Sequence, residues 1–259
     1  MTSKPVFDIQ LTTYSLSIQL SLNGFSFCIA SPDGEIISTY QEKNTGETLN
    51  EEDLLDKVKN AFNNKPELQA AFEKIEVIYQ NELFTLVPKD IFKEENIIDY
   101  LDYSIKTLAT DFITHDVITN TDIVNVFIPY ININNYLIEK LGTFNYTHSS
   151  SILIEKVLKE DNNDTKVFTL ISDGLFEVII TKDKKLLLFN TFRYSTNEDI
   201  LYYLLFCMEQ LSLSPDEIEL ILLSSINEDL YNLLYTYVRH VTKSSKETEI
   251  LLHELVLNI

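Results

Sequence analysis

A pattern of alternating residues that occurs twice constrains the fold of this chain more than any other feature. From Tyr14 to Leu22 apolar and polar residues alternate without interruption, and Asn23-Gly24 separates them from a second apolar run. An Asn-Gly or Asp-Gly pair between apolar runs is a strong hairpin signal, because both residues tolerate positive φ. Strict alternation also predicts one buried and one exposed face. The predicted strands span residues 14–22, 25–29 and 36–40.

The same order of segments returns 150 positions later, where Asp173-Gly174 again separates two apolar runs. After each set of strands, a segment that begins at Thr48 or at Ser195 fits the capping box at the start of a helix. A short apolar strand then follows each of the two predicted helices. The predicted order is β-β-β-α-β twice, with a parallel return strand reached through a crossover helix, which is a duplicated α/β architecture. The second set of strands spans residues 166–172, 175–181 and 186–192, and the two return strands span 75–79 and 218–222.

A polar, turn-rich run from Lys159 to Asp164 is the best candidate for a domain boundary. We therefore expect a first lobe over residues 1–160, which carries inserted helices and strands. A second, shorter lobe is expected over residues 161–259.

The charge of the chain limits its partners. It carries 40 acidic and 20 basic side chains, a formal net charge of −20. Nucleic acids are bound through Lys and Arg side chains that neutralise phosphates, and an anionic membrane surface repels an acidic protein, so neither is an expected partner. Cys28 and Cys207 stand apart from each other, as is typical of free thiols in a reducing compartment. The sequence shows no signal peptide and no apolar stretch of membrane length, so the expected location is the cytoplasm.

Two segments carry a resemblance to a known family. Tyr14 to Ile29, with Gly24-Phe25-Ser26-Phe27 at its centre, and Val126 to Asn132 are similar to an uncharacterised bacterial family of the Bacteroidetes. The resemblance implies an actin-like ATPase fold, of the ribonuclease H-like kind, with two lobes and no established activity. The actin-like fold hosts kinases, chaperone ATPases and filament proteins, so the fold alone does not give the function.

The resemblance also implies where a nucleotide would bind. In actin-like proteins the first turn of each set of strands is a phosphate loop, with an aspartate two positions before a glycine. Here those positions hold Leu22 and Ser172, while Asp173 is adjacent to Gly174. A plain hairpin turn explains Asp173-Gly174 better than a phosphate loop does.

A second element of the actin-like site is a glycine pair that approaches adenosine, and Ser224-Ser225 stands at the matching place. Asp173, Gly174, Ser224 and Ser225 are thus candidates for a vestigial nucleotide site. We expect no cofactor and no catalysis. The alternative is a divergent ATPase or phosphotransferase that binds ATP with Mg²⁺ in the cleft between the lobes.

The remaining candidates are histidines and aromatic residues. His148 precedes three serines that are better explained as helix caps, and His115, His240 and His253 lack the spacing of metal ligands. The helix after Ser195 is apolar nearly all round, which predicts deep burial or an inter-lobe contact. The two residues that we expect at a contact surface are Tyr231 and Tyr235, one helical turn apart. The first hypothesis is therefore a non-catalytic interaction or scaffold protein, whose partner and oligomeric state the sequence does not specify.

Overall fold

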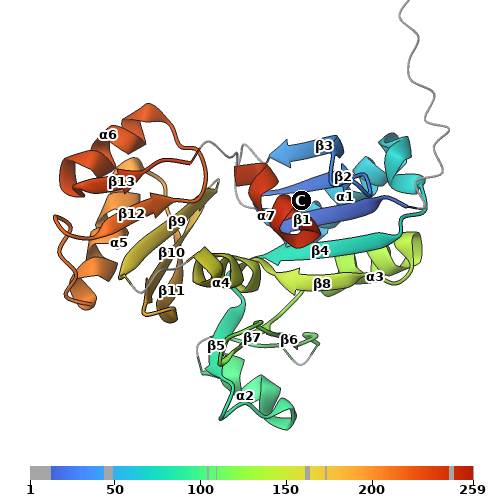
Figure 1. The fold of residues 1–259 in the computed structure, drawn as a ribbon. Helices are drawn as coiled ribbons and strands as arrows, with labels where there is room; N and C mark the ends of the chain where they lie inside the picture. The colour runs from blue at the N-terminus through green and yellow to red at the C-terminus, as the bar shows by residue number, and fades with distance from the viewer. Residues whose placement is uncertain are drawn as a thin grey trace, which may run out of the picture. The chain divides into compact units, whose positions relative to one another are not determined.

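The computed structural model describes residues 13–43, 49–103, 105–108, 110–160, 164–172, 174–244 and 248–258 (Figure 1). The chain divides into two compact units. Unit 1 comprises residues 1–117, 122–149 and 253–259, and unit 2 comprises residues 118–121 and 150–252. The division after residue 160 stays a prediction about domains.

The main sheet of unit 1 has the strand order β3-β2-β1-β4-β8. The first three strands form an antiparallel meander, and β4 returns parallel to β1. This topology is the predicted β-β-β-α-β order. The strands are β1 (Ser15–Ser21), β2 (Gly24–Ala30), β3 (Ile36–Lys43), β4 (Lys74–Gln80) and β8 (Asn145–His148).

The crossover from β3 to β4 runs through α1 (Glu51–Asn64) and the short 3-10 helix η1 (Pro66–Gln69). Asn50 caps α1 by accepting a hydrogen bond from the Asp53 N–H, so the helix starts two residues later than a cap at Thr48 would place it. α3 (Ile131–Leu141) ends at Gly142, which has φ 78° as a C-terminal cap. The apolar faces of α1 and α3 join those of β1, β2 and β4 in one core.

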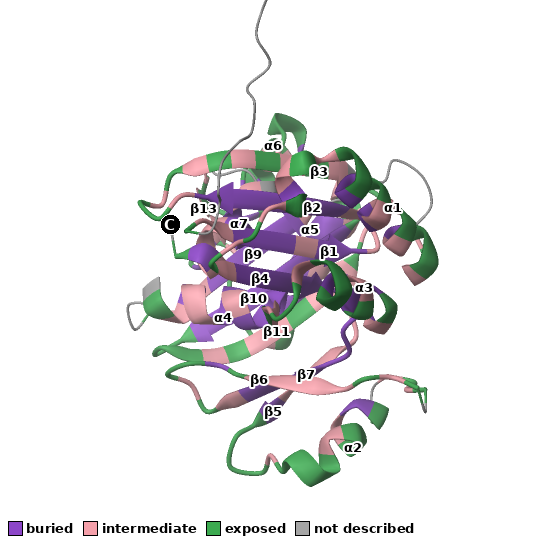
Figure 2. Ribbon diagram, turned by 90° about the vertical axis from the view of Figure 1, so that its right-hand side faces the viewer, coloured by how far each residue is buried: buried purple, intermediate pink, exposed green. Residues whose placement is uncertain are grey.

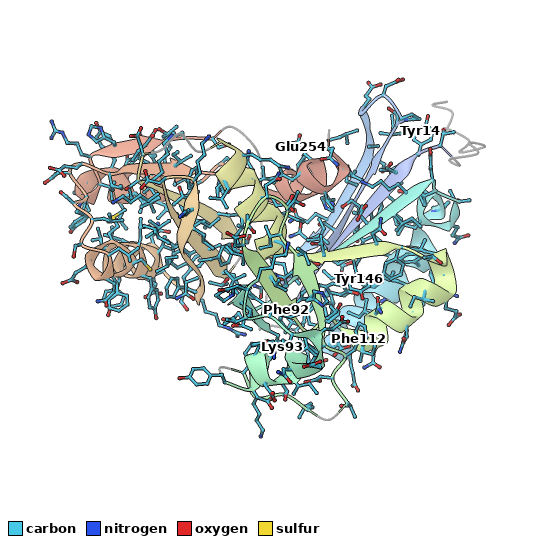
Figure 3. All side chains as sticks on the ribbon, turned by 60° about the horizontal axis from the view of Figure 1, so that its bottom comes forward. Tyr14, Phe92, Lys93, Phe112, Tyr146 and Glu254 are labelled. Carbon is cyan, nitrogen blue, oxygen red and sulfur yellow. The ribbon has the colours of Figure 1, made fainter. Side chains whose placement is uncertain are left out.

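A second, smaller sheet in unit 1 has the order β5-β7-β6, from β5 (Phe84–Pro88), β6 (Thr114–Val117) and β7 (Ile123–Phe127). The sequence from Asp90 to about Ala109 predicts a helical region. This predicted region is too long, because among its described residues only η2 (Glu94–Asn96) and α2 (Ile97–Asp102) are helical. Phe92, labelled in Figure 3, stacks on Tyr100 and lies 4.8 Å, centroid to centroid, from the ring of His115. His115 is therefore part of an aromatic cluster.

The sheet of unit 2 repeats the first topology in the order β11-β10-β9-β12-β13. β9 and β10 are antiparallel, and β12 returns parallel to β9 after the crossover helix α5. Its elements are α4 (Ser149–Glu160), β9 (Lys166–Ser172), β10 (Leu175–Lys182), β11 (Lys185–Arg193), α5 (Asn197–Gln210), β12 (Glu219–Leu222), α6 (Glu228–Tyr237) and β13 (His240–Thr242). The C-terminal helix α7 (Thr248–Leu257) passes from unit 2 into unit 1 at His253.

Two predicted exposures are wrong. The polar face of β1 is not exposed: Ser17 is fully buried and Ser21 nearly so, because β1 is a central strand covered on both sides (Figure 2). Of the two alternatives for α5, deep burial is wrong, since Tyr202 is 63% exposed and Phe206 is also exposed, while the inter-lobe contact stays a prediction. In both cases the pattern identified the element, and the tertiary packing decided which face meets solvent.

Candidate functional site

The first turn of unit 1 is a closed hairpin. Ser21 pairs with Gly24, so the turn residues are Leu22 and Asn23. The Asn23 N–H donates to the Ser21 Oγ at 3.1 Å, and the Leu22 carbonyl accepts from the Leu49 N–H at 3.0 Å. Phe25, which follows the turn, packs inward against Phe27 and Tyr40. The backbone and side chains around this turn are thus engaged within unit 1.

The matching turn in unit 2 is held by one tyrosine. Ser172 pairs with Leu175, and Gly174 between them has φ 73°, a conformation that favours glycine. The Tyr194 N–H donates to the Gly174 carbonyl at 3.1 Å, and the Tyr194 hydroxyl donates to the Ser172 carbonyl at 2.9 Å. Asp173 lies outside the described residues. These contacts define Gly174 as a hairpin residue.

The loop after β12 contains the serine pair that was matched to the adenosine loop. Ser224 is buried, and its Oγ has no hydrogen-bond partner in the described part of the chain, whereas Ser225 is exposed. Asn227, just beyond, accepts a 2.8 Å hydrogen bond from the Leu230 N–H and caps α6. The loop therefore leads into a capped helix.

The described residues do not fit the phosphate loops that the fold family would use for Mg²⁺-ATP. The position two residues before Gly24 is the apolar Leu22, which packs against the core of unit 1. The Asn23 N–H is already bonded to Ser21. Within the ranges that the structure describes, no group of three His, Cys, Asp or Glu side chains is placed to hold a metal ion. Of the four nucleotide-site candidates, the structure describes Gly174, Ser224 and Ser225.

A polar cluster that the sequence did not reveal lies on the polar face of β1, which is also buried. His253 on α7 is bonded through Nδ1 to the Ser17 Oγ at 2.7 Å and through Nε2 to the Ser26 Oγ at 2.9 Å. On the same face, the Gln19 Nε2 donates to the Gln80 Oε1 at 2.8 Å. Ser17 of the alternating pattern and Ser26 of β2 therefore bind the C-terminal helix instead of water.

Burial lowers the pKa of His253 to about 3, so the imidazole is neutral near pH 7. A neutral imidazole has one N–H and one acceptor nitrogen, so one serine hydroxyl donates to the ring and the other accepts from it. All three side chains are almost completely shielded from solvent. The cluster therefore fastens α7 to the sheet and offers no access to a substrate. The sequence signal was a polar residue, Ser or Gln, at every second position of β1, combined with a histidine in an apolar C-terminal segment.

His148 is also buried and neutral, with its pKa lowered to about 3 by burial. Its ring lies 4.6 Å from that of Phe84 and 5.3 Å from that of Phe127, centroid to centroid, and its backbone N–H donates to the Asp116 Oδ2 at 2.9 Å. α4 begins at the next residue, Ser149. His148 is thus a core residue of unit 1 and not a general base for the serines that follow it.

The predicted contact residues Tyr231 and Tyr235 do lie together on α6. Their rings stack with 5.9 Å between centroids, and the Lys243 Nζ lies 3.5 Å from the Tyr231 centroid and 2.9 Å from the Glu228 Oε1. Tyr235 is 57% exposed, while Tyr231 packs partly against the core of unit 2. Only Tyr235 of the pair therefore offers most of its ring to solvent.

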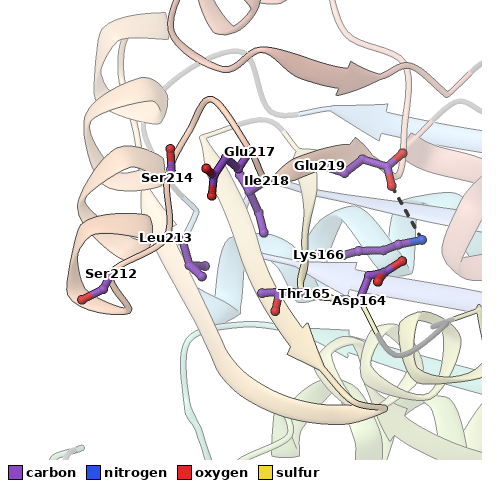
Figure 4. Close-up of a pocket in the computed structure, with 9 residues that line it drawn as sticks. All are labelled: Asp164, Thr165, Lys166, Ser212, Leu213, Ser214, Glu217, Ile218 and Glu219. Carbon is purple, nitrogen blue, oxygen red and sulfur yellow. Dashed lines mark ion pairs between the residues drawn. The ribbon is translucent and has the colours of Figure 1, made fainter.

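A polar pocket of about 470 Å³ lies at one end of β9 and β12 in unit 2 (Figure 4). The Lys166 Nζ on its wall pairs with the Glu219 Oε2 at 3.6 Å. The pocket is lined by Asp164, Thr165, Lys166, Ser212, Leu213, Ser214, Glu217, Ile218 and Glu219. Its basic side chain is ion-paired and the other charged groups are acidic, so it does not resemble a phosphate site.

A family model described as protein of unknown function, DUF3822, matches residues 4–241. The chain belongs to the DUF3822 family. No curated protein matches it. The resemblance inferred from Tyr14–Ile29 and Val126–Asn132 is thereby confirmed at the level of the family.

Solved structures agree on the fold of this DUF3822 protein. A Bacteroides thetaiotaomicron protein with an actin-like ATPase fold and unknown function is 22% identical, with a TM-score of 0.84 over 96% of this chain and 97% of that chain. The PilM–PilN type IV pilus biogenesis complex is similar at 13% identity, with a TM-score of 0.54 over 89% of this chain and 88% of that chain. The predicted actin-like fold is confirmed. In the described residues, no helix has the length and apolar character needed to cross a bilayer.

Proposed function

We propose that this DUF3822 protein is a non-catalytic interaction or scaffold protein, located in the cytoplasm, in which a duplicated actin-like framework carries a degenerate nucleotide site. The observation that carries the proposal is the state of the two hairpin turns. In unit 1 the turn N–H of Asn23 donates to Ser21, and the apolar Leu22 stands where the phosphate loop of the fold family has an aspartate. In unit 2 Ser172 stands at that place, and Tyr194 holds the turn as a hairpin through the carbonyls of Ser172 and Gly174. A phosphate loop instead needs backbone N–H groups directed at the ligand.

Aromatic side chains support the interaction role. Tyr235 is well exposed on α6, and Tyr202 and Phe206 are exposed on α5 of the same unit. Aromatic residues combine a large apolar area with few rotatable bonds, and Tyr adds a polar tip, which suits protein interfaces. The PilM–PilN structure is itself a complex of a protein with a similar fold. The partner that we propose is a protein, and the net charge of −20 argues against nucleic acid and anionic membrane.

Titration calorimetry with millimolar Mg²⁺-ATP and Mg²⁺-ADP tests the proposal. The expected result is no binding heat above the dilution control and no rise in the unfolding temperature, because a ligand raises the stability only when it binds the folded state. Stoichiometric Mg²⁺-dependent binding would overturn the degenerate site.

One observation favours the alternative of a divergent ATPase or phosphotransferase. The Ser224 Oγ is buried without a hydrogen-bond partner among the described residues, as a hydroxyl that awaits a ligand would be. The alternative predicts a thermal upshift with Mg²⁺-ATP that is lost in Asp173→Ala and reduced in Ser224→Ala. Tyr235→Ala serves as the control, since α6 would not contribute to such a site.

A further inference from the structure

Strand β11 is an edge strand with an apolar sequence. It pairs with β10 along one side and is the last strand of its sheet. Four apolar residues follow one another from Leu186 to Phe189, yet no residue of β11 is buried, and Leu187 is 45% exposed (Figure 2). An edge strand presents backbone N–H and C=O groups to which another strand can pair, and natural edges are usually protected by polar or charged residues. β11 carries no polar or charged residue from Leu186 to Phe189, and an irregularity in its pairing with β10 falls at Leu187.

The equivalent edge strand of unit 1 shows that the topology does not require apolar residues here. β3 occupies the same place in the order β3-β2-β1-β4-β8, but after Ile36-Ile37 it continues as Ser38-Thr39-Tyr40-Gln41-Glu42. Its aromatic residue, Tyr40, stacks inward on Phe27 with 5.5 Å between centroids. The apolar stretch is thus a property of β11 and not of every edge strand in this fold.

Aromatic rings continue from β11 onto the exposed side of α5. Phe192 of β11 stacks on Tyr203 with 4.6 Å between centroids, and Tyr203 contacts Tyr202 at 5.2 Å. Tyr202 in turn stacks on the exposed Phe206. A strand added beside β11 would place every second side chain on the α5 side of the sheet, toward these rings. Strand addition gains affinity from main-chain hydrogen bonds and specificity from such alternate side-chain contacts.

The charges at the two ends of β11 indicate which kind of strand could pair with it. Lys182, Lys184 and Lys185 surround the turn before the strand, and Arg193 ends it, so residues 182–193 carry four basic side chains and one acidic side chain, Asp183. This segment is basic within a chain of net charge −20. Symmetric antiparallel pairing of two copies along the whole strand would place Lys185 of one copy opposite Arg193 of the other, and like charges in such positions are unfavourable. An acidic partner avoids that repulsion.

We propose that β11 accepts an extended segment of a partner protein as an added strand, with apolar side chains at alternate positions and acidic residues at its ends. The proposal rests on the proposed interaction function. It adds that β11 is the interaction surface and that the partner segment is acidic at its ends.

The test uses the full chain and synthetic eight-residue peptides of alternating Val and Thr. One peptide has two Asp at each end, the second has two Lys at each end, and the third is the Asp peptide with a central Pro that cannot form the strand ladder. Fluorescence anisotropy at low salt measures binding. The Asp peptide is expected to bind at least tenfold more tightly than the Lys or Pro peptide. Amide hydrogen exchange is expected to slow in β11 when the Asp peptide is added.

Leu187→Thr is the matched substitution, because Thr is well tolerated in strands while it removes most of the apolar contact. Its control is Ile37→Thr on β3, where the aliphatic side chain is 42% exposed on the other edge strand. Leu187→Thr is expected to weaken the binding of the Asp peptide at least tenfold, whereas Ile37→Thr is expected to weaken it less than twofold. Circular dichroism checks that both variants fold.

Three results would each overturn the inference: no binding of the Asp peptide, equal binding of the Asp and Lys peptides, or equal effects of the two substitutions. Self-association in sedimentation that Leu187→Thr abolishes would assign the strand to a second copy instead. The peptide experiments and the nucleotide titration are independent measurements. A failure of this inference is therefore distinguishable from a failure of the proposed function.

Discussion

Replacing His253 with alanine is expected to destabilise unit 1 strongly. The imidazole satisfies two buried hydroxyls, Ser17 at 2.7 Å and Ser26 at 2.9 Å. Its removal leaves both hydroxyls buried without that partner, and each loss costs about 1–3 kcal/mol, or about 2–6 kcal/mol together. The free energy of unfolding of a domain is only about 5–15 kcal/mol. The substitution therefore removes a large share of the stability of unit 1 at neutral pH.

The same histidine makes the stability depend on pH. The folded-state pKa of His253 is about 3, below its ordinary value near 6.5, so the unfolded chain binds the proton more tightly. Stability contributed by the neutral ring is complete above pH 6.5 and is lost as the pH falls toward 3, at about 1.4 kcal/mol per pH unit. By pH 5 the wild type loses about 2 kcal/mol through this residue. The His253→Ala variant lacks this loss, so its deficit relative to wild type is expected to shrink by that amount.

Urea denaturation at pH 7.5, 6.0 and 5.0 measures both effects, with tyrosine fluorescence as the probe because the chain has 14 Tyr and no Trp. His240→Ala is the control: His240 is exposed on β13, and its substitution is expected to change the free energy of unfolding by less than about 0.5 kcal/mol. If His253→Ala lowers the free energy of unfolding no more than His240→Ala does at pH 7.5, the inferred role of the buried cluster is wrong. If the difference in free energy of unfolding between His253→Ala and the wild type stays constant down to pH 5, the inference that the buried imidazole is neutral is wrong.

Three further predictions concern single features. Gly142→Ala is expected to cost about 1 kcal/mol in urea denaturation, because φ is 78° while nothing lies within 4 Å of the added Cβ; a neutral result would contradict that backbone conformation. Asn227→Ala removes the 2.8 Å cap of α6 and is expected to cost about 1 kcal/mol in the same assay, whereas Asn227→Ser is expected to cost less. Burial raises the pKa of both Cys28 and Cys207 to about 11, so a thiol reagent at pH 8 is expected to leave the native protein unmodified and to label two thiols per chain in urea; rapid labelling without urea would show that a thiol is accessible.

The eight strands of the two repeats were predictable to within three residues at each end, because period-two patterning and Gly-containing turns are local signals. The cap of α5 was nearly predictable as well: Thr196 and Asp199 form the capping box, one residue later than the box predicted at Ser195. The segment over residues 90–109 was misjudged because its apolar residues pack on a small sheet, which no local pattern reveals. The solvent exposure of each face was the property that the sequence predicted least well. The sequence shows that β1 alternates, but only the fold shows that α7 covers its polar face.

The two hairpin turns explain why a repeated sheet topology can be predicted from the sequence while its chemistry cannot. Asn23-Gly24 and Asp173-Gly174 were matched at an offset of 150, but the pairing of Ser21 with Gly24 and of Ser172 with Leu175 shows that Gly174 is equivalent to Asn23.

The similar dipeptides therefore do not occupy equivalent positions, and the correct offset is 151. The likeness between the two units depends on strand pairing and on buried faces, which many sequences satisfy. Phosphate binding would depend on the direction of a few backbone N–H groups in the turn, and a shift of one residue changes that direction. A repeated turn signal is thus evidence for a repeated sheet, whereas what the turns can bind depends on particular groups such as the Asn23 N–H, which is bonded to Ser21.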